Sequence, residues 1–119
     1  MRPLYEASIA ATEELQEARL RVVRLSAELS RVEHDLRLLR ARVERRLVRK
    51  VGGEKALAPT VEDRARIFTL ALAADPEYEA ERKHRDEIAL ELEEAKAEVA
   101  ALRDRLDVML AAMRVVESD

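Results

Sequence analysis

The chain has 119 residues and a net charge of −3, made up of +4 over residues 1–50 and −7 over residues 51–119. Charged residues make up 39% and aromatic residues 3%, and there are only two glycines and three prolines. This composition favours long helices or a coiled coil over a mixed fold with a thick core, and the absence of cysteine excludes disulfides and thiolate metal sites.

The first predicted element is one long helix over about residues 4–50. Its apolar residues recur at alternating steps of three and four, which is typical of a coiled-coil seam, here four heptads long. Pro3 suits the first turn of a helix, where a missing N–H has no consequence. The seam residues are Leu15, Ala18, Val22, Leu25, Leu29, Val32, Leu36, Leu39 and Val43.

The end of this helix is strongly basic, since residues 37–50 carry seven basic side chains and a single acid, Glu44. Beyond Val43 the apolar residues continue as Leu47 and Val51, at steps of four, so the seam drifts around the helix. Four arginines spaced i, i+3, i+4 and i+7 then occupy roughly the opposite side. We call these four residues the arginine stripe: Arg42, Arg45, Arg46 and Arg49.

A break follows the basic helix. We expect Gly52 and Gly53 to end it, because glycine readily adopts the left-handed cap conformation, and we expect a connector over Glu54–Pro59. Thr60, with Asp63 three residues later, resembles a capping box and predicts a second, short helix. The apolar residues predicted to share one face of that helix are Val61, Ala65, Phe68 and Leu72.

A second long helix is predicted over about residues 76–117. Asp75 suits the N-cap and Pro76 the first helical position, and acids in the first turn favour the positive end of the helix dipole. The alternation of three and four then returns. The seam residues of this helix are Ile88, Leu92, Ala95, Val99, Leu102, Leu106, Met109, Met113 and Val116.

Together these elements predict an all-α fold, an antiparallel long-helix coiled-coil hairpin with a short helix in the connector (residues 51–74), forming one domain over residues 1–119. Because two helices alone bury little surface, we expect further copies of the chain to complete the seam as a homo-oligomer. The second seam, extended backward, reaches Glu81 and Arg85, level with Arg46. These groups either form a buried polar layer or stay in water where the helices splay, and we expect splaying.

The sequence contains no catalytic constellation, so we expect no enzymatic activity and no cofactor. It has no Gly-rich phosphate loop, no cysteine nucleophile and no serine paired with a histidine in a recognisable context. Glu81 and His84 match half of a di-iron carboxylate motif but lack the other half, so we expect no metal site. Phe68 and Tyr78 either stack on bases or pack the tip of the hairpin, of which packing is the more common role.

The arginine stripe is the strongest candidate for a functional surface. An arginine-rich outer face is often only a solvated surface, but here Glu44 alone stands against the basic residues. Arginine forks fit phosphate oxygens, and copies in an oligomer would multiply such contacts, so we predict nucleic-acid binding, with an acidic protein partner as the alternative. The candidate nucleic-acid-binding residues are Arg42, Arg45, Arg46, Arg49, Lys50, Lys55 and Arg64.

Over about residues 25–115, five short motifs occur in an order that resembles a known family. They are a basic doublet before Leu, a glycine break, an Asp-Arg pair, Leu-x-x-Asp, and a late Leu-Asp followed by Arg. Here they stand at Arg45-Arg46-Leu47, Gly52-Gly53, Asp63-Arg64, Leu72 to Asp75, and Leu106-Asp107 with Arg114. In this order they resemble the UvsY-like recombination mediators of tailed phages.

The resemblance implies a ring-like homo-oligomer that binds single-stranded DNA and helps load a RecA-like recombinase while displacing a single-strand-binding protein. It implies DNA contacts by Arg46 and, beside it, Arg45. Glu44 stands where the family has another basic residue, and Arg49 and Lys50 replace aromatic residues expected after the doublet. Because no apolar run approaches the roughly 20 residues of a membrane span, we expect no membrane partner and a cytoplasmic location, in the host cell if the protein is phage-encoded.

Overall fold

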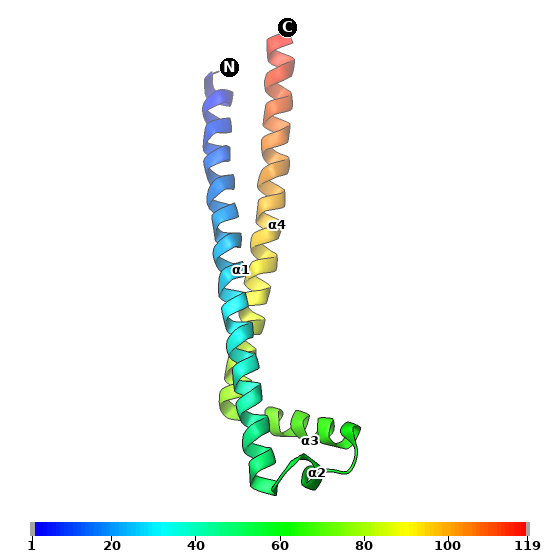
Figure 1. Cartoon of the computed structure of the whole chain (residues 1–119). Coiled ribbons are helices and arrows are strands. Elements are labelled where there is room, and N and C mark those ends of the chain that lie inside the picture. Colours follow the sequence, from blue (N-terminus) through cyan, green and yellow to red (C-terminus); the bar gives the residue numbers. More distant parts are fainter. Residues whose placement is uncertain (1, 119) are drawn as a thin grey trace. The chain divides into compact units, whose positions relative to one another are not determined.

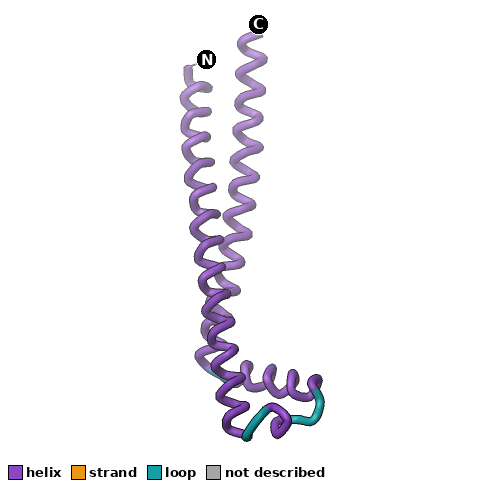
Figure 2. Tube along the Cα trace, in the orientation of Figure 1, coloured by secondary structure: helices purple, strands orange, loops and turns teal. Residues whose placement is uncertain are grey.

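The computed structural model describes residues 2–118, which form four α-helices and no strand (Figures 1 and 2). The long helices are α1 (Arg2–Val51) and α4 (Pro76–Ser118), and between them lie α2 (Glu54–Leu57) and α3 (Val61–Ala74). The predicted all-α class, with two long helices joined through a short one, is confirmed. The additional turn α2 falls in the segment predicted to be a plain connector.

The chain divides into two compact units. The terminal unit combines α1 as far as Ala27 with α4 from Ile88 onward, and the central unit consists of residues 28–87. Each unit therefore contains a stretch of α1 together with a stretch of α4 from the other end of the chain, and the central unit also contains α2 and α3.

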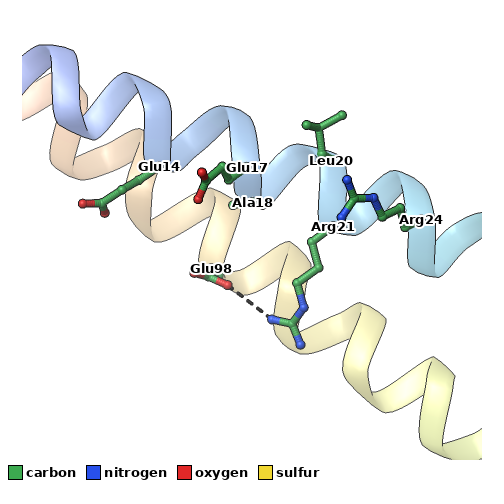
Figure 3. A pocket seen from close by; sticks show the side chains of 7 residues that line it. All are labelled: Glu14, Glu17, Ala18, Leu20, Arg21, Arg24 and Glu98. Atoms are coloured by element: carbon green, nitrogen blue, oxygen red, sulfur yellow. Dashed lines mark hydrogen bonds and ion pairs between the residues drawn. The ribbon is translucent and has the colours of Figure 1, made fainter.

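The core of the terminal unit follows the predicted seam and extends it back by four residues to Ala11. The prediction is wrong at the end of α4, where the predicted seam residue Val116 is 47% exposed. Ala95 is fully buried, and two exposed ion pairs flank the seam, Arg21 to Glu98 at 3.5 Å (Figure 3) and Arg105 to Glu14 at 3.9 Å. Glu14 and Arg21 are seven residues apart on α1, and their partners on α4 are also seven residues apart but in the reverse order. This is the register of an antiparallel heptad pair. The buried seam residues of this unit are Ala11, Leu15, Ala18, Leu25, Ile88, Leu92 and Ala95.

The central unit continues the α1 seam through Val32, Leu36 and Val43, all of which are buried. Leu72 of α3 and Ala58, just after α2, are the other buried apolar residues of this unit. The connector between the long helices therefore contributes its own buried residues to this unit.

Glu81 and Arg85 lie half-buried in the central unit, where the backward extension of the α4 seam places them. Arg85 Nε lies 2.8 Å from Asp86 Oδ1, and 38% of the Arg85 side chain is exposed. Arg46 is exposed, and no ion pair joins it to Glu81 within residues 2–118. These groups stay in contact with water, as expected, and do not form a buried polar layer.

The Gly52-Gly53 pair ends α1 in a Schellman motif. The Gly53 N–H donates to the Val48 carbonyl at 3.0 Å and the Gly52 N–H to the Arg49 carbonyl at 3.3 Å, so two terminal carbonyls of the helix are satisfied. Both glycines have positive φ, 89° at Gly52 and 132° at Gly53. The predicted glycine cap is confirmed.

Replacing Gly52 with alanine is expected to lower the free energy of unfolding by about 1 kcal/mol, because an L side chain is strained at this φ. A Cβ at Gly52 would meet no atom within 4 Å, so no steric clash adds to the strain. Thermal unfolding followed by circular dichroism checks this. Gly52→Asn should lose less, because asparagine tolerates the left-handed region; equal losses in both variants would contradict this explanation.

The predicted helix starts are both capped. The Thr60 hydroxyl accepts a hydrogen bond from the Asp63 N–H at 3.1 Å, and Asp75 Oδ1 accepts one from the Tyr78 N–H at 2.9 Å. Pro76 is the first residue of α4, as the sequence indicates.

The predicted inner face of α3 is wrong in part. Val61 is 73% exposed and Ala65 is also exposed, while Ile67 and Ala71 are half-buried together with Phe68. The reason is α2, which packs against α3 and is linked to it by an ion pair of 3.8 Å. With α2 in place, the side of α3 that faces inward is rotated about the helix axis by roughly 50° from the predicted side, which is half of the 100° between successive residues.

Candidate nucleic-acid interface

The arginine stripe lies on the outer side of α1 in the central unit, and all four of its arginines are exposed. After Val43 the inward side of α1 moves to Leu47 and Val48, which are half-buried, whereas Val51, predicted to continue the seam, is 38% exposed. At about 100° per residue, the direction midway between Leu47 and Val48 is roughly opposite the stripe. The drift of the seam is therefore real, but it ends at Val48 and not at Val51.

The stripe surrounds a shallow surface depression of about 370 Å³, lined by the four arginines and Leu38. Leu38 is 52% exposed and supplies an apolar wall; it was not among the predicted site residues. Its spacing could have identified it, because Leu38 precedes Arg42 by four residues and Arg45 by seven and so shares their helix face.

None of the stripe arginines forms an ion pair with a carboxylate of residues 2–118. Glu44, the only acid between Arg37 and Lys50, instead accepts a hydrogen bond of 2.9 Å from Arg40 Nε. That hydrogen bond, and the attraction between the two charges, raise the pKa of Arg40 above its ordinary value. The charge of Glu44 is thus matched by Arg40 and not by an arginine of the stripe.

Acidic side chains border one end of the stripe. Arg42 shares a second depression, of about 260 Å³, with Asp35 of α1 and with Glu77 and Glu81 of α4. No ion pair forms among them, but the three carboxylates weaken the positive potential around Arg42. The potential is therefore expected to be strongest over Arg45, Arg46 and Arg49.

The other three predicted binding residues differ in their surroundings. Lys50 and Lys55 are exposed, at the end of α1 and in α2, and extend the positive region toward the connector. Arg64 is held within the fold: its side chain is 20% exposed, its Nη1 lies 3.8 Å from Glu54 Oε2, and its Nε donates to the Thr60 carbonyl at 3.2 Å. Arg64 therefore ties α3 to the connector and does not extend the stripe.

The half-motif of Glu81 and His84 does not gather further ligands. His84 Nε2 lies 4.0 Å from Glu28 of α1. Within residues 2–118 no three histidine, aspartate or glutamate side chains stand close enough together to hold a metal ion. None of the helices within these residues has an apolar stretch long enough to cross a membrane.

Comparison with known protein families, with curated proteins and with solved structures gives no significant match to this chain. What the structure defines is an all-α protein of two long helices with an arginine stripe near the end of the first, and this stripe has no carboxylate partner within residues 2–118.

Proposed function

We propose that this protein is a non-enzymatic, single-stranded-DNA-binding accessory protein of phage-type recombination, which helps load a RecA-like recombinase. The observation that carries the proposal is the arginine stripe, four exposed arginines on one helix face without a carboxylate partner in residues 2–118. The order of motifs that resembles the UvsY-like mediators supports the recombination role, together with displacement of a single-strand-binding protein.

The chemistry of the stripe suits a flexible, phosphate-rich strand. Guanidinium groups form paired hydrogen bonds to phosphate oxygens and remain charged at any physiological pH. Three exposed positions, Arg45, Arg46 and Arg49, lie within little more than one helical turn, so one strand can contact them together. No part of the stripe depends on a deep pocket, as expected for binding without strong sequence preference.

A homo-oligomer would multiply this surface. The far end of α4, in the terminal unit, carries large apolar side chains that a single hairpin leaves exposed, among them Val108 (69%), Leu110 (41%) and Val116 (47%). Exposed apolar side chains gathered on one segment favour contact with another protein surface, and further copies of this chain would supply one.

A mobility shift with a single-stranded oligonucleotide across a salt series tests the proposed function. We expect a shift at low salt that weakens steeply as salt rises, because counterions released from the strand drive the binding. A protein that leaves the oligonucleotide unshifted at about 20 mM salt does not have this function.

A second candidate is a coiled-coil scaffold or adaptor whose basic tip, around the stripe and the connector, docks an acidic protein. The observation that favours it is a pair of exposed apolar side chains on α3, Val61 (73% exposed) and Leu70 (71% exposed), which lie on roughly opposite sides of that helix. Nucleic acid does not require such side chains, whereas protein interfaces commonly use them. In the same salt series, a protein that binds an acidic polypeptide but no oligonucleotide would establish this second function in place of the first.

A further inference from the structure

A second basic surface lies on the other flank of α1 in the central unit. It is a depression of about 280 Å³ between α1 and α4, lined by Glu33, Leu36, Arg37, Arg40, Tyr78 and Arg85. Three arginines, one carboxylate and the half-buried Tyr78 line it, and two of these arginines also pair with carboxylates outside the lining, Arg40 with Glu44 and Arg85 with Asp86. The sequence gives Tyr78 either a stacking or a packing role, and its spacing does not connect it with these arginines.

This depression is separate from the arginine stripe. At about 100° per residue, Arg37 and Arg40 lie roughly 160° around α1 from the middle of the stripe. The residues of α4 are also divided between the two depressions. Tyr78 and Arg85 line this one, whereas Glu77 and Glu81 line the one beside Arg42. The two basic surfaces therefore occupy opposite flanks of α1.

The arginines of the depression are available to an anion. Arg37 is exposed and has no carboxylate partner within residues 2–118. Arg85 contacts Asp86 through Nε, at 2.8 Å, which leaves its terminal nitrogens for another acceptor. Arg40 is joined to Glu44, and such exposed ion pairs are weak enough to be exchanged for a phosphate.

Tyr78 is held in place by the start of α4. Its N–H donates to the capping carboxylate of Asp75 at 2.9 Å, so its backbone belongs to the first ordered turn of the helix. Leu36, which is buried, also lines the depression and adds an apolar side chain to it. An aromatic ring, an apolar side chain and several guanidinium groups together match a nucleotide, which has both a π-face and a phosphate.

We propose that this depression holds one nucleotide of a single strand, with its base stacked on Tyr78 and its phosphate bound by Arg37 and Arg85. The inference rests on the proposed function, because it assigns a second contact to the same ligand. A free phosphate would bind the arginines alone, whereas a nucleotide would also contact the ring of Tyr78. The experiment therefore measures the fluorescence of that ring.

The composition of the chain allows a direct readout. There is no tryptophan, and the two tyrosines are Tyr5 and Tyr78, so in a Tyr5→Phe variant all tyrosine fluorescence comes from Tyr78. We expect this emission to fall to a plateau as an oligonucleotide of deoxythymidine is added at low salt. Tyr78→Ala should weaken binding roughly 5- to 150-fold, the range measured for loss of one stacked base, and Tyr78→Phe should retain most of the affinity.

The outcomes separate this inference from the proposed function. If the Tyr5→Phe protein binds the oligonucleotide with unchanged tyrosine emission, the strand binds elsewhere, and the inference fails while the proposed function stands. If it binds no oligonucleotide, both fail. Equal losses of affinity in Tyr78→Ala and Tyr78→Phe, with helicity retained, would also overturn the stacking role.

Discussion

Replacing Arg45, Arg46 and Arg49 together with alanine is expected to weaken binding of a single-stranded oligonucleotide roughly 10- to 100-fold at about 50 mM salt. Each phosphate contact to a single strand contributes about 0.7 to the slope of log affinity against log salt, so losing three contacts should reduce that slope by about 2. Helicity should be retained, because the three side chains are exposed and alanine is the strongest helix former. The measurement is a titration across salt with circular dichroism alongside.

A matched control distinguishes the stripe from net charge. Arg19, Arg24 and Arg114 are also exposed helix residues without a carboxylate partner within residues 2–118. Replacing these three with alanine removes the same charge and should change affinity much less than the stripe variant does. Similar losses in both triple variants would mean that binding follows overall charge and not the stripe.

Leu92→Ala is expected to lower the free energy of unfolding by about 2 to 3 kcal/mol and the melting temperature by about 10 °C. Leu92 is 6% exposed in the seam of the terminal unit, so the change removes buried apolar surface and leaves a cavity. The lower part of the usual range applies because a seam between two helices can collapse more readily than a thick core. Thermal unfolding at fixed protein concentration measures it.

Leu90→Ala is the control for this prediction, two residues away on the same helix. Leu90 is 62% exposed, so the same change of side chain and of helix propensity should alter stability by no more than about 0.5 kcal/mol. Equal destabilisation by the two changes would show that Leu90 is buried in an assembly of several chains, or that the seam is not as described.

Features of the fold that depend on local sequence could be predicted. The heptad spacing identified the seam, from Leu15 to Val43 in α1 and through Ile88, Leu92 and Ala95 in α4, because a paired helix must bury one stripe. The glycine pair and the capping residues fixed where the helices end and begin, since each satisfies backbone groups within a few residues.

Features that depend on segments meeting in space could not be predicted. The turn α2 has only four residues and no apolar period, yet it packs against α3 and turns the inward face of that helix away from Val61. The prediction that Arg64 belongs to the basic surface failed in the same way, because it could not foresee that Glu54 of α2 and the Thr60 carbonyl hold its side chain.

The candidate site also has one part that local sequence determines and one part that depends on two segments meeting in space. The stripe could be predicted because its four arginines share one face of a single helix, which spacing alone determines. The depression around Tyr78 could not, because it depends on the register between α1 and α4, which brings Arg37 of one helix beside Tyr78 and Arg85 of the other.

Native mass measurement of the protein, with and without a single-stranded oligonucleotide, tests the central claim most directly. We predict a species of more than one chain that gains the mass of the oligonucleotide at low salt and loses it as salt is raised. The stripe variant should keep the assembly and fail to gain that mass. A protein whose mass is unchanged by the oligonucleotide at low salt would contradict the proposal that the arginine stripe binds single-stranded DNA.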